Sequence, residues 1–153
     1  MGKTSLVKKV KALTEGPRLI VVYMDINKCR TAYDFYEKFA SSIIHATAGK
    51  VEKMIECAPE FFMGVTPRIV YSPEPNTDFS LALEFNPRVN APEEILDLPE
   101  MIAKKKGVQI VVCIDEFQQI GEMPDALVLQ KTIRSVWNII AALFIACLAA
   151  VST

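Results

Sequence analysis

The chain has 153 residues, enough for one domain with its own hydrophobic core. Its 17 basic and 18 acidic side chains leave a formal net charge of −1, which excludes an overall electrostatic preference for nucleic acid or an anionic membrane. No two of the four cysteines have the Cys-x-x-Cys spacing. This usage argues against a metal site and a disulfide framework, and it predicts free thiols in a cytoplasmic protein.

The first predicted element is an amphipathic helix over residues 4–14. Its leucines and valines fall on one face, and its lysines fall mostly on the other. Gly16 and Pro17 end this helix, because glycine can take the left-handed cap and proline cannot continue a helix.

The residues at the start of this helix have the chemistry of a phosphate-binding site. Met-Gly-Lys-Thr-Ser matches the closing half of the phosphate-binding loop G-x-x-x-x-G-K-S/T. The free N–H groups and the dipole of a helix N-terminus attract anions. Lys3 would add a positive charge for the β- and γ-phosphates, the Thr4 hydroxyl can bind magnesium, and Gly2 lets the backbone approach a phosphate. The alternative is that a basic start of this kind has no function.

A continuous apolar run at residues 18–26 is rich in β-branched side chains and predicts a strand buried on both faces of a parallel sheet. Asp25 ends that run, and we interpret it as a turn residue because Asn27 and Thr31 follow it. Thr31 and Asp34 have the spacing of a capping box, which predicts the start of a second helix.

The middle of the chain predicts a β-hairpin and then two short helices. Residues 67–85 alternate between apolar and polar side chains on either side of a turn at residues 72–78, which indicates an inserted hairpin with one wet face. In residues 90–107, Pro92 and Pro99 each suit the first turn of a helix, so two short helices are predicted. Three lysines before Gly107 complement the dipole at the end of the second one.

A second apolar run at residues 108–114 ends in Asp115 and Glu116. In an open parallel sheet, ligands bind outside the carboxyl ends of the strands, where these two acids fall. Hydrolysis of a triphosphate uses one carboxylate to hold magnesium and another to orient the attacking water, roles that suit Asp115 and Glu116 respectively. The alternative is that the acidic pair only marks the exit of the strand into solvent.

The Gly-Lys-Thr-Ser start and the Ile-Asp-Glu-Phe-Gln segment resemble the ATPase domain of prokaryotic AAA+ ATP-binding proteins close to the STAND-like ATPases. Residues 23–44, the hairpin region and residues 129–137 share this resemblance. The resemblance covers residues 1–137. It implies an α/β fold with a three-layer α/β/α sheet, and it implies ATP and Mg²⁺ as ligands. The implied roles are nucleotide binding by Gly2, Lys3, Thr4 and Ser5, magnesium binding by Thr4 and Asp115, and water activation by Glu116.

The chain departs from this family pattern at both ends. The earlier glycine of the loop and the first central strand before it have no counterpart, so we expect a partial P-loop sheet with weak or absent ATPase activity. Residues 138–153 form an apolar tail for which three interpretations stay open. These are a buried helix or strand, a frame-shifted or otherwise abnormal end, and a membrane segment at residues 138–151, which is short of the ~20 residues a span needs.

The functional expectation is therefore ATP binding, coupled in the intact domain to magnesium-dependent hydrolysis and to a protein partner or self-association. The alternative is an α/β remnant that no longer turns over ATP and serves as an interaction module.

Overall fold

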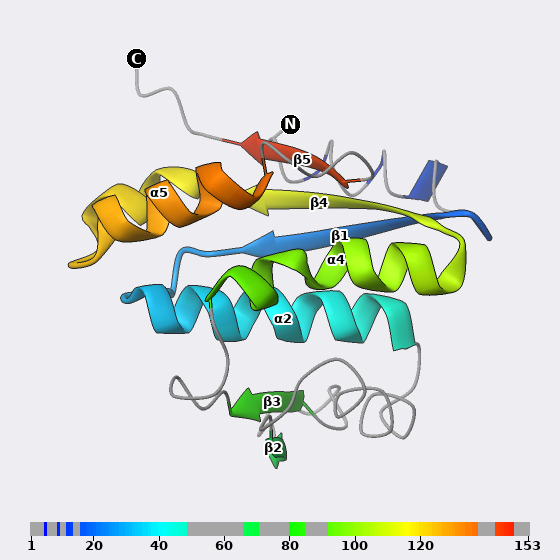
Figure 1. Cartoon of the computed structure of the whole chain (residues 1–153), viewed down its shortest axis with the longest axis horizontal. Helices are drawn as coiled ribbons and strands as arrows, with labels where there is room; N and C mark the ends of the chain where they lie inside the picture. The colour runs from blue at the N-terminus through cyan, green and yellow to red at the C-terminus, as the bar shows by residue number, and fades with distance from the viewer. Residues whose placement is uncertain are drawn as a thin grey trace.

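The computed structural model describes residues 16–48, 66–70, 80–84, 92–137 and 143–148, together with Ser5, Lys9, Ala12 and Leu13. At 66–70, 80–84 and 143–148 the description covers the backbone. These residues form a mixed α/β fold with a parallel sheet, a separate antiparallel hairpin and three helices (Figure 1). The α/β class predicted from the sequence is confirmed.

The parallel sheet has three strands, with the strand that carries the acidic pair in the middle. Its order is β1 (Leu19–Asp25), β4 (Gln109–Asp115) and β5 (Leu143–Leu148). Both apolar runs thus form strands, as predicted. The pairing aligns Asp25 with Asp115, so the carboxyl ends of β1 and β4 lie at the same edge.

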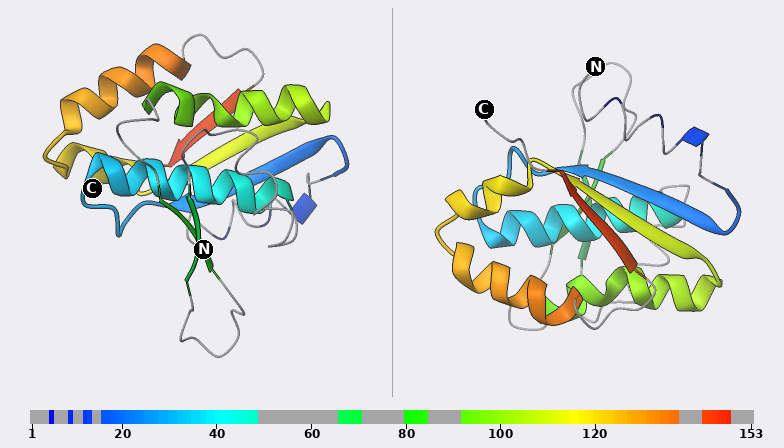
Figure 2. Two further views of the ribbon diagram at one scale, coloured as in Figure 1. Left: turned by 60° about the horizontal axis from the view of Figure 1, so that its bottom comes forward. Right: turned by 90° about the horizontal axis from the view of Figure 1, so that it is seen from above.

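One face of this sheet packs on the helices. The strands contribute alternate residues to the main core cluster. These are Val22 and Met24 of β1 and Ile110, Val112 and Ile114 of β4. Helices α2 (Ala32–Ala48) and α4 (Pro92–Lys106) lie along this face, and α5 (Ala126–Trp137) joins the same cluster through its buried residues (Figures 1 and 2). The helix residues in the cluster include Phe35, Phe39, Ile43, Leu96, Leu98, Leu129 and Ile133.

The opposite face of the sheet is buried at some positions and half-buried at its other apolar positions. Val21 is 4% exposed and Cys113 is 8% exposed, and both alternate with the residues that face the helices. Burial of residues on both faces of the sheet therefore explains why the sequences of β1 and β4 are continuous apolar runs, as predicted. The residues described for the predicted first helix, Ser5, Lys9, Ala12 and Leu13, have helical backbone and are exposed.

The capping box predicted for the second helix is confirmed. The Asp34 N–H donates to Thr31 Oγ1 at 3.2 Å, and the Thr31 N–H donates to Asp34 Oδ2 at 2.9 Å. The Arg30 N–H donates to the same carboxylate oxygen at 2.8 Å. Hydrogen bonds from the Arg30 and Thr31 backbone stabilise the charged form and hold the pKa of Asp34 below its usual value.

The prediction of two short helices at residues 90–107 is wrong, because α4 runs unbroken through Pro99. A proline inside a helix removes one hydrogen bond and costs about 3 kcal/mol. Ile95, Leu96, Leu98 and Ile102 lie on both sides of Pro99 and are all at most 3% exposed. Burying each such side chain contributes about 1.5–3 kcal/mol, so one continuous buried face outweighs the broken hydrogen bond.

The two glycines predicted to end helices behave differently. Gly107 has φ 64°, and the Val108 N–H donates to the Ala103 carbonyl at 3.1 Å, which is the left-handed ending of α4. The left-handed cap proposed for Gly16 is wrong. Gly16 and Leu19 instead exchange two backbone hydrogen bonds of 3.1 Å, which turn the chain directly into β1.

The predicted hairpin is confirmed at the level of the backbone. β2 (Thr66–Val70) pairs antiparallel with β3 (Ser80–Glu84), in a register that aligns Thr66 with Glu84 (Figure 1). β3 contacts α2, so the hairpin lies on the side of α2 away from the parallel sheet. The turn at residues 72–78 and the wet face lie outside the described residues and side chains.

Two elements near the C-terminus were less well anticipated. A 3-10 helix over Phe117–Glu122 separates β4 from α5 and was not predicted. Within the apolar tail the structure describes one strand, β5, which pairs in parallel with β4, and the rest of the tail lies outside the described residues. Within the described ranges, every helix is too short or too polar to cross a bilayer.

The Thr31 cap gives the first testable prediction. Thr31→Ala removes the side-chain acceptor for the Asp34 N–H and should lower the free energy of unfolding in urea by about 1 kcal/mol. Thr31→Ser keeps an acceptor at the same position and should stay close to wild type. Equal losses in both variants would contradict a capping role.

Candidate functional site

The candidate site lies at the carboxyl edge of the parallel sheet, where β1 and β4 end together. Asp25 and Asp115 are aligned across the two strands, and the Ile26 N–H donates to the Asp115 carbonyl at 3.3 Å. This backbone contact continues the pairing one residue beyond β1. The edge is where ligands of open parallel sheets gather.

Asp115 is the one buried polar or charged side chain among the described residues, with 7% of its surface exposed. The Tyr23 hydroxyl donates to its Oδ2 at 2.7 Å, and the Glu116 N–H donates to its Oδ1 at 3.0 Å. Removing a carboxylate from water is costly unless donors replace the lost hydration. Each oxygen of Asp115 therefore has a donor, and the plane of the carboxylate is held from two sides.

Glu116 has an unusual backbone conformation. Its φ of 59° and ψ of 35° lie in the left-handed region, and it is the one non-glycine residue with positive φ within the described ranges. For a residue with a Cβ atom this conformation costs about 1–2 kcal/mol. The Gln119 N–H donates to the Glu116 carbonyl at 2.9 Å, which turns the chain into the 3-10 helix.

The side chain of Glu116 is half-buried and accepts a hydrogen bond from Gln118 Nε2. The left-handed backbone thus ends β4 abruptly. Because of it, the Glu116 side chain points in a different direction from the one it would have if the strand continued. Local strain of this kind is found preferentially at functional sites. It is the observation that best separates this acidic pair from an ordinary strand end.

Asp25 has the role of a turn residue, as predicted. It is exposed, and its Oδ1 accepts a hydrogen bond of 2.8 Å from the Asn27 N–H. This contact is the local bond that aspartate makes with the backbone two residues ahead. The two aspartates at this edge therefore have different environments: Asp115 is buried on the sheet, and Asp25 is exposed and closes a turn.

The predicted phosphate-binding residues are mostly outside the part of the chain that the structure describes. Gly2, Lys3 and Thr4 fall there, so their position relative to Asp115 stays a prediction. Ser5 is described, has helical backbone and is exposed. Among the described His, Cys, Asp and Glu side chains, no group of three or more is arranged to hold a metal ion.

The Asp115 carboxylate is nevertheless chemically suited to magnesium. Magnesium is bound in proteins through one or two carboxylates, and it keeps several of its waters. The Tyr23 hydroxyl and the Glu116 N–H donate to different oxygens of this carboxylate and help to hold it in place. The donor set fits a single carboxylate that contacts magnesium directly or through water.

Tyr23 was not singled out from the sequence. The signal that identifies it is the register, since Tyr23 pairs with Cys113 and is therefore the diagonal neighbour of Asp115. Side chains on diagonal positions of adjacent strands share one face, and an aromatic side chain can span that separation. The register requires both strands to be placed, so composition alone does not disclose this contact.

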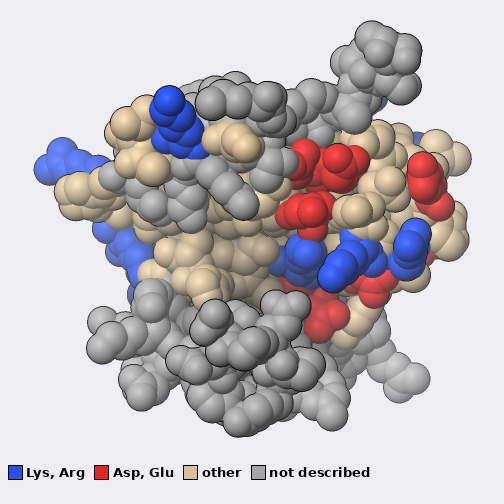
Figure 3. Space-filling view, turned by 180° about the vertical axis from the view of Figure 1, so that it is seen from behind, with Lys and Arg blue, Asp and Glu red and all other residues tan. Residues whose placement is uncertain are grey.

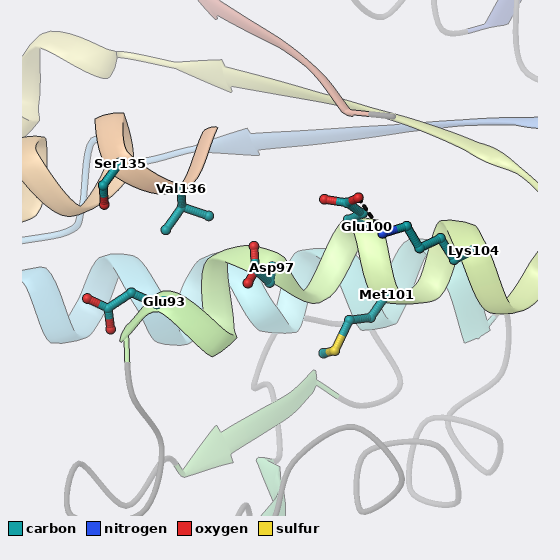
Figure 4. Close-up of a pocket in the computed structure, with 7 residues that line it drawn as sticks. All are labelled: Glu93, Asp97, Glu100, Met101, Lys104, Ser135 and Val136. Atoms are coloured by element: carbon teal, nitrogen blue, oxygen red, sulfur yellow. Dashed lines mark ion pairs between the residues drawn. The ribbon is translucent and has the colours of Figure 1, made fainter. Parts of the chain in front are cut away.

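A second feature missed in the sequence is a cavity of about 520 Å³ between α4 and α5 (Figure 4). Its lining residues are Glu93, Asp97, Glu100, Met101 and Lys104 of α4, with Ser135 and Val136 of α5. Lys104 Nζ lies 2.6 Å from Glu100 Oε1 and neutralises one of the three acids. Burial, and then the charges of Glu100 and Glu93, raise the pKa of Asp97, and Lys104 opposes this shift.

Charged side chains of both signs lie on the surface. On the face shown in Figure 3, acidic and basic side chains of the described residues lie next to one another.

Comparisons with known proteins add no assignment. No family model matches the sequence, and no match was found among curated proteins or among solved structures. The functional argument therefore depends on the site itself.

The backbone of Glu116 gives the second testable prediction. Glu116→Gly should be at least as stable as wild type and about 1 kcal/mol more stable than Glu116→Ala, because glycine relieves the left-handed strain and alanine does not. Urea unfolding of the three proteins measures the order. An alanine variant more stable than the glycine variant would show that this conformation is not strained.

The acidic cavity gives the third prediction. Because the folded pKa of Asp97 is raised, the folded state binds its proton more tightly than the unfolded state does. Asp97→Asn should therefore be more stable than wild type at pH 7. The difference in stability between the variant and wild type should shrink as the pH falls through the folded pKa of Asp97 and on to the ordinary value of 3.8. The midpoint of thermal unfolding of both proteins, followed against pH, measures this difference. A constant difference across this pH range would contradict the assignment.

Proposed function

We propose that this chain binds ATP with magnesium at the carboxyl edge of its parallel sheet, as a three-layer P-loop domain of the AAA+/STAND-like class. The observation that carries the proposal is the buried Asp115 carboxylate at the end of β4, followed by the left-handed Glu116. A buried carboxylate held by two donors at a strand end is difficult to explain as a solvated strand exit. Its chemistry suits a hard divalent cation.

The roles of the residues follow from their chemistry. Asp115 holds the magnesium ion, which when bound neutralises charge on the β- and γ-phosphates. Lys3 contributes a second positive charge to the phosphates, Thr4 contributes a hydroxyl to the metal, and Gly2 and Ser5 belong to the same phosphate-binding turn. In turnover, Glu116 orients a water molecule and accepts its proton.

Support for Glu116 in this role comes from its placement. It is adjacent to Asp115, half-buried rather than fully solvated, and its carboxylate is aimed by a backbone conformation outside the strand alternation. The Gln118 amide donates to it, so the carboxylate has a defined position instead of moving freely in solvent. A general base requires such positioning before its proton affinity matters.

A non-catalytic interaction module is the second candidate. The observation that favours it is on α5, where Leu127 is 74% exposed and the adjacent Val128 is 67% exposed. Two large apolar side chains next to each other on a helix surface suit a contact with a protein partner or with a second copy of the chain. This function does not require ATP, so the two candidates are separated by one binding measurement.

The fourth prediction is magnesium-dependent ATP binding, measured by isothermal titration calorimetry with and without Mg²⁺. Lys3→Ala should lower the affinity about tenfold or more, because a charge-assisted hydrogen bond contributes about 1.5–3 kcal/mol. Lys9→Ala removes an exposed lysine close to Lys3 in the sequence and should bind like wild type. Asp115→Asn should abolish the gain from Mg²⁺, and Glu116→Gln should retain binding and lose any turnover.

The contradicting result is equally clear. A folded wild-type protein that shows no ATP binding at millimolar Mg²⁺ would remove the nucleotide proposal and leave the interaction module. Equal losses for Lys3→Ala and Lys9→Ala would show that the effect of Lys3 is only overall charge.

A further inference from the structure

We infer that Tyr23 is a positioning residue for magnesium, acting by fixing the carboxylate of Asp115 through its hydroxyl. The inference deepens the proposed function and rests on it. No motif in the sequence assigns a role to this tyrosine. Its hydrogen bond to Asp115 joins two residues that are 92 positions apart along the chain.

The position of Tyr23 follows from the alternation of β1. Val22 and Met24 point into the helix-covered core, so Tyr23 lies on the opposite face of the sheet with Val21. On β4 the same alternation puts Asp115 on this second face, because Ile114 belongs to the core. The hydrogen bond of 2.7 Å between the Tyr23 hydroxyl and Asp115 Oδ2 confirms that the two side chains share it.

This hydrogen bond is partly buried, and Tyr23 has apolar neighbours on the same face of the sheet. Cys113, which pairs with Tyr23 across the strands, is 8% exposed, and Val21 is 4% exposed. A hydrogen bond to a charged acceptor is stronger in such surroundings than in water, because solvent competes less for either partner. The ring of Tyr23 can pack on this face while its single polar atom reaches the carboxylate.

Two donors on different oxygens leave the carboxylate little freedom to rotate. The Glu116 N–H, a backbone group, holds Oδ1, and the Tyr23 hydroxyl, a side-chain group, holds Oδ2. Magnesium demands near-ideal octahedral geometry and discriminates against a misplaced ligand. Partners that orient a metal-binding carboxylate typically contribute 10–100-fold in metal affinity.

A purely structural role for Tyr23 makes a different prediction. In that case, removal of the hydroxyl would lower the stability of the fold and would leave the magnesium requirement unchanged. The Mg²⁺ concentration that gives half-maximal ATP binding separates the two roles, since it does not depend on the stability of a protein that remains folded.

The fifth prediction uses Tyr23→Phe, which keeps the ring and removes the hydroxyl. The Mg²⁺ midpoint for ATP binding should rise about 10–100-fold, and the affinity for ATP measured without Mg²⁺ should not change. Tyr33→Phe removes the hydroxyl of a tyrosine that is 42% exposed on α2 and should behave like wild type. Val22→Ala, on the core face of β1, should lower stability without moving the midpoint.

A double variant tests whether Tyr23 acts through Asp115. In the Asp115→Asn background, Tyr23→Phe should produce no further change in the Mg²⁺ dependence, because no carboxylate remains to be oriented. An unchanged midpoint in Tyr23→Phe alone would overturn the positioning role and leave the proposed ATP site intact. Absence of ATP binding in the wild-type protein would overturn the proposed function, and this inference with it.

Discussion

The parallel pairing of β1 with β4 is the constraint on which the candidate site depends. Because strand side chains alternate, the burial of Ile110, Val112 and Ile114 in the helix-covered core forces Asp115 onto the other face. A slip of one residue would place the carboxylate in the apolar core and expose Ile114. The hydrophobic pattern of β4 thus fixes where the acid lies, although the acid contributes nothing to that pattern.

The energetic consequence of this placement is a buried charge that must be compensated locally. Tyr23 and Glu116 each supply a donor to Asp115, and Glu116 does so from a backbone conformation that is itself unfavourable. A strand end that only had to reach solvent would need neither feature, because an exposed aspartate is hydrated without strain. Asp25, which is exposed at the same edge and closes an ordinary turn, is the natural comparison.

Much of the fold could be predicted because local signals agreed with tertiary packing. The strand runs and the Thr31 cap each depend on a few neighbouring residues. Pro99 was misjudged because a local rule for proline was outweighed by burial along the whole length of α4. The 3-10 helix after Glu116 was missed because it has no periodic apolar pattern to indicate it.

The site was predictable only in part, for a related reason. Asp115 and Glu116 were found from their position after an apolar run, a property of the sequence alone. Tyr23 was missed because its relevance depends on the register between two distant strands. The strand at Leu143–Leu148 stayed one of several interpretations, since an apolar run does not say by itself which element it forms.

The most direct test of a metal–nucleotide site at this edge is paramagnetic broadening of backbone NMR signals by Mn²⁺ with ATP, since manganese accepts the same oxygen ligands as magnesium. The account predicts that the amides of Ile26 and Glu116 broaden strongly, whereas those of Leu19 and Gln109, at the other ends of β1 and β4, broaden far less. Those ends lie roughly 20 Å away at about 3.3 Å per residue. Equal broadening at both ends, or stronger broadening at Leu19 and Gln109, would contradict a site at the carboxyl edge.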